Sequence, residues 1–174
     1  MNRCALRLLC RTALLCALLC VLSVITVPIG AVPVTLGLLG VFLIGLLLPP
    51  RYASLGVLGY LLLGAVGLPV FSSMQGGFGI LLGITGGYLW GYLPTVWLIS
   101  VLCSRPQNTS VIRRVTAVLA ALLLCYLCGT VQFCLVSSCS VTAALTACVL
   151  PFVPFDLCKL FAAVYLSHRF RYHL

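Results

Sequence analysis

The sequence carries very little charge, and almost none of it is acidic. Only 6% of its 174 residues are charged, and Asp156 is the single acidic residue. A soluble domain needs far more polar surface, so this composition excludes one. The chain has no GxxxxGK[ST] loop for nucleotide phosphates, no His/Glu cluster for a metal, and no spare acid for a Ser-His-Asp set. We therefore expect neither an enzyme nor a bound cofactor.

Long hydrophobic runs occupy most of the chain. Hydrophobic residues make up 63% of it, and the mean hydropathy is +1.28. A membrane-spanning helix needs roughly 20 apolar residues, so the length allows about six. We predict an all-α polytopic membrane protein in which residues 1–174 form a single domain of six transmembrane helices. The apolar spans lie at 5–25, 29–48, 52–68, 84–103, 112–135 and 140–168, the last interrupted before a final helix at about 155–168.

The basic residues predict the orientation of these helices. Apart from Lys159, the Lys and Arg residues precede or open the first span, lie at the 2–3 and 4–5 connections, or follow the last span. They are Arg3, Arg7, Arg11, Arg51, Arg105, Arg113, Arg114, Arg169 and Arg171. The positive-inside rule makes that side cytoplasmic, with both termini inside a cell membrane that is crossed several times. The net charge of +9 thus reflects topology, and no nucleic-acid partner is expected.

Asp156 and Lys159 are two ionisable residues within an apolar stretch, 149–162. A spacing of three places both side chains on one helix face, near the predicted outer end of the last helix. Each alone would cost about 2.5–3.5 kcal/mol at mid-bilayer, so intramembrane charges of this kind usually have a function. The two side chains are expected to neutralise each other or to hold one polar ligand together.

Three irregular segments fall on the same predicted outer side, at 27–34, 67–88 and 151–154. They are rich in proline or glycine, and non-helical backbone at membrane depth persists only where it is buried in protein or lines a cavity. We therefore predict that these outer segments form a ligand site with the charged pair. An exposed external loop remains the alternative for 67–88. The candidate residues of that segment are Phe71, Ser73, Gln75, Thr85 and Tyr88.

The span at 84–103 also contains Tyr88, Trp90, Tyr92 and Trp97. Aromatic residues of this kind are typical of the belt at the membrane interface. Tyr88 directly follows the glycine-rich segment, which makes it the aromatic residue that we expect to face a ligand.

Small residues four apart, Ala13 and Ala17, lie on the first predicted helix. Such spacing lets a second helix approach closely. The pattern leaves open whether that second helix belongs to this chain or to another membrane subunit.

Most of the eleven cysteines lie within predicted helices, where cysteine behaves as a small apolar residue. Cys125 and Cys128 form a CxxC pair, but no histidine lies nearby, so we predict no metal or redox site. Cys134 and Cys139 fall on the outer side, and the sequence leaves open whether they pair.

Several motifs in order resemble the BioY family, over about residues 26 to 170. They are PVTL at 33–36, GLLLPPR at 45–51, GYLLLGAVGLPVF at 59–71, GGFG at 76–79, TGGYL at 85–89 and LPFVPFDLCK at 150–159. The GLPVF…TGGY block together with the P-x-DL-x-K block makes the resemblance specific. BioY proteins are the biotin-binding S components of energy-coupling factor transporters.

The resemblance implies a six-helix protein that captures biotin at the outer face. It implies docking on a transmembrane coupling subunit, through Ala13 and Ala17, and energy from two cytoplasmic ATPase subunits. It further implies that Asp156 and Lys159 contact biotin. Two poses stay open: the pair holds the urea group, or Lys159 binds the ligand's carboxylate while Asp156 accepts a urea N–H.

Two other classes of function remain as alternatives. A proton-coupled carrier would use Asp156 as its relay and would need no ATPase partner. A purely structural membrane protein would keep Asp156 and Lys159 only as a neutralised packing pair.

Overall fold

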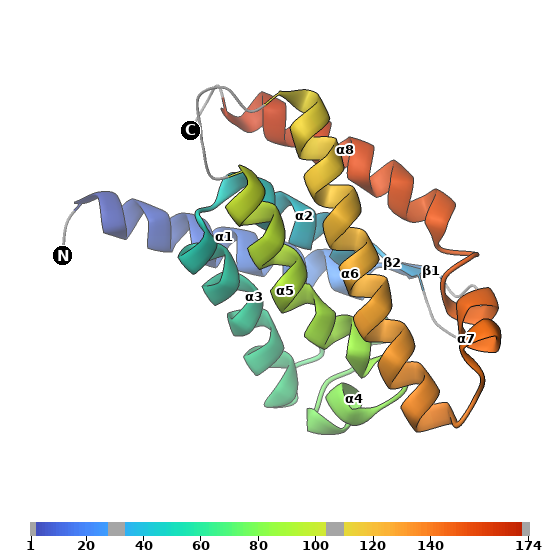
Figure 1. Cartoon of the computed structure of the whole chain (residues 1–174). Coiled ribbons are helices and arrows are strands. Elements are labelled where there is room, and N and C mark those ends of the chain that lie inside the picture. Colours follow the sequence, from blue (N-terminus) through green and yellow to red (C-terminus); the bar gives the residue numbers. More distant parts are fainter. Residues whose placement is uncertain (1–2, 28–33, 104–109, 172–174) are drawn as a thin grey trace.

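The structure is a computed structural model, and it describes residues 3–27, 34–103 and 110–171. Its longer helices are α1 (Arg3–Val24), α2 (Gly37–Leu47), α3 (Pro50–Ala65), α5 (Gly86–Cys103), α6 (Val111–Ser137) and α8 (Val153–Arg171) (Figure 1). The shorter elements are strands β1 (Thr26–Val27) and β2 (Val34–Thr35), a 3₁₀ turn (Ser72–Met74), α4 (Phe78–Leu82) and α7 (Val141–Cys148). Each of the six predicted spans therefore contains one helix of at least 11 residues.

Among the described residues, three helices, α1, α5 and α6, are long and apolar enough to cross a membrane, and α2 is a shorter apolar helix. The all-α architecture is thus as predicted, while the number of membrane crossings stays a prediction. The bounds differ most in the second span, predicted at 29–48, because α2 begins only at Gly37. There β1 and β2 pair antiparallel, with Thr26 opposite Thr35, so the chain reverses before the helix starts. The rest of that connection, 28–33, and Arg105 lie outside the described residues.

Helix α2 forms the centre of the bundle and packs against α1, α5 and α8. Nine of its eleven residues are buried, which is expected of a helix that is apolar all round. Its glycines allow close approach of the neighbouring helices. A Cβ built on Gly40 would lie 2.9 Å from the Leu19 side chain of α1, and one on Gly45 would lie 2.9 Å from Ile99 of α5. Larger residues at these positions would force the helices apart.

The outer surface of the bundle is apolar. Large aliphatic side chains such as Leu14 of α1, Leu62 of α3 and Leu123 of α6 are more than half exposed. Exposed apolar side chains in this number are typical of a surface that faces lipid.

The predicted break in the last apolar span is present. Helix α7 ends at Cys148, and α8 begins at Val153, two residues before the predicted start of the final helix at about 155. Pro154 lies in the first turn of α8, where its missing N–H leaves no helical bond unmade. Asp156 lies in the same turn.

The glycine-rich segment 67–88 is fastened to the bundle rather than free. Gln132 of α6 donates hydrogen bonds to the carbonyl oxygens of Leu81 at 3.0 Å and Gly83 at 2.9 Å. The indole N–H of Trp90 also donates to the Leu81 carbonyl, at 3.1 Å. Side chains at its surface, such as that of Phe78, remain exposed. The segment is therefore bound to the bundle at Leu81 and Gly83, while side chains such as that of Phe78 are exposed at the surface.

Candidate substrate-binding site

A cavity of about 70 Å³ lies among the helices where the irregular segments meet. A single buried water needs on the order of 10–15 Å³, so this cavity has room for more than one or two waters. Val34 from the first segment, Thr85 from the second and Phe152 from the third all line it. The three segments that the sequence places on one side thus converge on one hollow.

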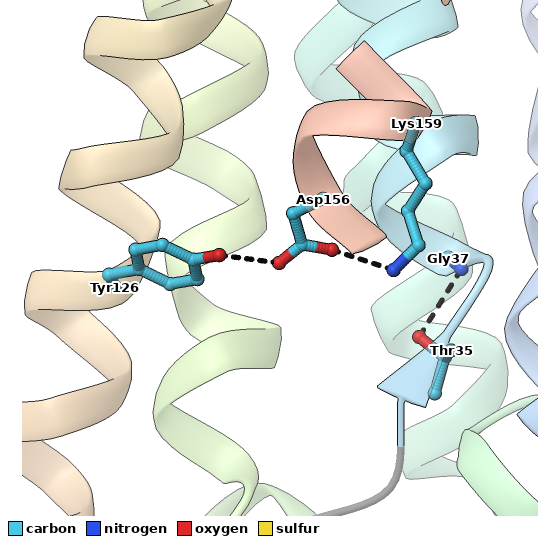
Figure 2. Close-up of polar contacts among 5 residues, drawn as sticks. All are labelled: Thr35, Gly37, Tyr126, Asp156 and Lys159. Carbon is cyan, nitrogen blue, oxygen red and sulfur yellow. Dashed lines mark hydrogen bonds and ion pairs between the residues drawn. The ribbon is translucent and has the colours of Figure 1, made fainter. Parts of the chain in front are cut away.

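Asp156 and Lys159 form part of the cavity wall. Lys159 Nζ donates to Asp156 Oδ1 at 2.6 Å, and the hydroxyl of Tyr126 donates to Asp156 Oδ2 at 2.6 Å (Figure 2). Asp156 is 2% exposed and Lys159 is 7% exposed. Buried charges must be paired, and these two neutralise each other while still bordering the hollow.

Local structure favours a carboxylate at this position. The backbone N–H of Asp156 makes the first helical bond of α8, to the carbonyl of Phe152 at 2.9 Å. The positive end of the helix dipole lies at this first turn and stabilises a negative charge. A carboxylate oxygen has two lone pairs, so each Asp156 oxygen can accept a further bond beside the one that it already makes. The carboxylate is therefore held in place and still available to a ligand.

Thr85 and Tyr88 also line the cavity. The Tyr88 ring lies so close to Gly129 of α6 that a Cβ on that glycine would overlap the ring. The Tyr88 hydroxyl donates to the carbonyl of Cys148 at 3.3 Å, which ties α5 to the end of α7. Four of the sequence-predicted site residues, Asp156, Lys159, Tyr88 and Thr85, are thus brought together.

The other three, Phe71, Ser73 and Gln75, do not line the cavity. Phe71 is fully buried beside it, edge-on to Tyr60 with ring centroids 5.5 Å apart. Ser73 and Gln75 are exposed at the surface. Ser73 has a φ of +56°, and in this turn its neighbour Ser72 lines the cavity instead. A direct role for these three in binding stays a prediction.

Three tyrosines are among the cavity-lining residues that the sequence reasoning missed. Tyr60, Tyr92 and Tyr126 all line the cavity, and Tyr92, interpreted above as part of the interfacial belt, is only 6% exposed. Its four-residue spacing from Tyr88 on α5 places both on one face and is the signal that could have found it. Tyr126 has no such signal, because only the packing of α6 against α8 brings it to Asp156.

The structure also places the small residues of α1 and the two outer cysteines that the sequence analysis considered. Ala13 and Ala17 are both exposed on α1, so neither is used for packing within the described part of this chain. Cys134 and Cys139 are both free thiols.

Comparisons with known proteins agree on one family. The chain matches the BioY family over residues 1–174. It is 34% identical over 165 residues to a protein of Thermotoga maritima named "Biotin transporter BioY", covering 95% of this chain and 96% of the relative. A protein of the same name from Rhodobacter capsulatus is 34% identical over 144 residues, covering 76% of each chain. A crystal structure at 2.1 Å, described as the S-component for biotin from an ECF-type ABC transporter, superposes with a TM-score of 0.92 at 27% identity, covering 98% of this chain and 94% of that one.

Proposed function

Because the chain belongs to the BioY family, we propose that it is a membrane subunit that captures biotin from outside the cell for an energy-coupling factor transporter. The relatives are named as transporters, and the structural neighbour is described as a biotin S-component. The observation that carries the proposal in this chain is the buried Asp156–Lys159 pair on the wall of a cavity.

The chemistry of the cavity suits biotin. Biotin combines an apolar bicyclic ring and aliphatic tail with a neutral urea group and one carboxylate. Small-molecule sites are mostly apolar with a few convergent polar groups, and here Leu38, Leu89 and Phe152 share the wall with the ion pair. A hydrogen bond to a charged partner contributes about 1.5–3 kcal/mol, so the pair can supply both affinity and orientation.

A coupling subunit in the membrane and two cytoplasmic ATPase subunits complete the proposed transporter. Helix α1 supports this part of the proposal, because it is poorly buried in the bundle and presents Ala13 and Ala17 outward. Small residues at that spacing let a helix of another subunit approach closely.

Biotin binding to the purified protein tests the proposal, with isothermal titration in detergent as the measurement. Uptake of labelled biotin is then measured in a biotin-auxotrophic host, with and without the coupling subunits. We expect binding by the purified chain, and uptake that rises when the coupling subunits are present. Absence of both binding and uptake would refute the proposal.

The variant Lys159→Ala tests the site within the same experiment. It should weaken biotin binding at least tenfold, because a hydrogen bond to a charged group is lost. An unchanged dissociation constant would remove Lys159 from the site.

A further inference from the structure

Four hydroxyl-bearing residues, Ser23, Thr35, Tyr60 and Tyr92, line part of the cavity and are called here the hydroxyl cluster. Three of their oxygens gather around the first residue of α2. A Cβ built on Gly37 would lie 2.7 Å from Ser23 Oγ and 3.2 Å from both Thr35 Oγ1 and the Tyr92 hydroxyl. Tyr60 stacks on Tyr92 with ring centroids 6.4 Å apart, and its hydroxyl faces Ser23. Three elements of the bundle and β2 thus direct hydroxyl groups to one place.

Two of these hydroxyls, those of Ser23 and Tyr60, face each other without a hydrogen bond of normal geometry among the described residues. Thr35 Oγ1 accepts the backbone N–H of Gly37 at 3.2 Å. Within the described part of the chain, Ser23 Oγ and the Tyr60 hydroxyl make no hydrogen bond of normal geometry, although Ser23 is 2% exposed and Tyr60 is fully buried. A buried unpaired hydroxyl destabilises a protein, and nearly all such groups in folded proteins have a partner. Two such hydroxyls on one cavity wall therefore indicate that a bound ligand supplies their hydrogen-bond partner.

The ligand atom beside the hydroxyl cluster is expected to be a hydrogen-bond acceptor. The Ser23 and Tyr60 hydroxyls can donate, and the positive end of the α2 dipole favours an atom with partial negative charge. Asp156, elsewhere on the same wall, contacts Lys159 as an ion pair, and a carboxylate can only accept hydrogen bonds. The cavity thus offers donors at the hydroxyl cluster and an acceptor at Asp156.

A urea group matches this division, because it has a carbonyl oxygen between two N–H donors. We propose that Ser23 and Tyr60 donate hydrogen bonds to the urea carbonyl of biotin, while Asp156 accepts one of the urea N–H groups. The Ser23 and Tyr60 side chains are uncharged and deeply buried, which suits a neutral carbonyl better than a hydrated carboxylate. The carboxylate of biotin, at the far end of its tail, then lies away from this cluster. This inference rests on the proposed function, and it assigns the urea end of biotin to the hydroxyl cluster and Asp156.

The test compares biotin with 2-iminobiotin at pH 7, where the protonated guanidine group of 2-iminobiotin presents only N–H donors in place of the urea carbonyl oxygen. Dissociation constants are measured for the wild type, Ser23→Ala and Tyr60→Phe. We expect each variant to bind biotin about tenfold more weakly, because one hydrogen bond to the carbonyl is lost. The preference of the wild type for biotin over 2-iminobiotin should shrink by the same factor, because the removed donor never served the imino group.

Two control variants and one stability measurement accompany the test. Ser54→Ala and Tyr52→Phe, in α3, remove the same atoms from side chains that do not line the cavity and should leave both dissociation constants unchanged. The ligand-free Ser23→Ala and Tyr60→Phe proteins should unfold at the wild-type temperature or above it, because each loses an unpaired buried hydroxyl.

Three outcomes would overturn the inference. The first is that Ser23→Ala and Tyr60→Phe bind biotin with the same dissociation constant as the wild type. The second is an equal loss of affinity for biotin and 2-iminobiotin, and the third is a lower unfolding temperature of both ligand-free variants, which would make the hydroxyls structural. Failure of the wild type to bind biotin is a different result, because it refutes the proposed function itself.

Discussion

Removing the Asp156–Lys159 pair in two steps separates its cost to the fold from its use in binding. Lys159→Met leaves the buried Asp156 carboxylate with only its bond from Tyr126. Asp156→Asn combined with Lys159→Met removes both charges and keeps an acceptor for Tyr126. The single variant should therefore be the less stable of the two.

The size of the effect follows from burial. Breaking a buried ion pair by removing one partner costs about 3–5 kcal/mol, whereas replacing both charges is often neutral. In a chain of this length, 1 kcal/mol shifts the unfolding temperature by roughly 2–4 °C, so Lys159→Met should unfold about 6–20 °C below the wild type. The double variant should recover most of that difference.

Biotin binding, unlike stability, should not recover in the double variant. Two hydrogen bonds to charged groups, at about 1.5–3 kcal/mol each, are lost in the double variant. Its dissociation constant for biotin should therefore rise about 10²- to 10⁴-fold, even though its stability recovers.

Thermal unfolding in detergent and isothermal titration with biotin measure the two quantities on the same samples. Arg51→Met serves as the control, because Arg51 is an exposed cation at the start of α3. A double variant that binds biotin like the wild type would show that the pair only packs the bundle. A Lys159→Met protein as stable as the wild type would show that the argument from burial is wrong.

Three further substitutions test other parts of the structure. Tyr126→Phe removes a 2.6 Å bond to Asp156 and should weaken biotin binding about tenfold by titration; unchanged affinity would mean that Lys159 alone positions the carboxylate. Gly64→Ala would drive a methyl group into the buried Phe71 ring and should cost about 1–3 kcal/mol in thermal unfolding, and a wild-type unfolding temperature would contradict this packing. Ala17→Trp, exposed on α1, should preserve biotin affinity but abolish co-purification with the coupling subunit, and retained co-purification would place the docking surface elsewhere.

Much of the fold could be predicted because a membrane makes helices readable as apolar runs. The error at 29–48 has a definite cause. The pairing of Thr26 with Thr35 is a contact between chain segments, and hydropathy cannot reveal which residues of an apolar run leave the helix to form it. The break before α8 was predictable because proline marks it directly in the sequence.

The candidate site could be predicted at its charged residues, which are rare in apolar helices, but not at its hydroxyl-bearing residues, which are common there. Asp156 and Lys159 stand out because charge is costly in an apolar helix. Ser23 and Tyr60 carry hydroxyls that are common in membrane helices, and only the packing of α1 and α3 shows that both face the cavity. Phe71 is hard to assign from sequence, because an apolar side chain near a site looks the same whether it touches a ligand or supports a residue that does.

The single acidic residue gives this chain a built-in spectroscopic label. Apart from the C-terminus, every carboxylate vibration of the protein arises from Asp156, and every lysine ammonium signal arises from Lys159. Difference infrared spectra recorded with and without biotinamide, which lacks the carboxylate of biotin, would therefore report the protonation and hydrogen bonding of one known side chain.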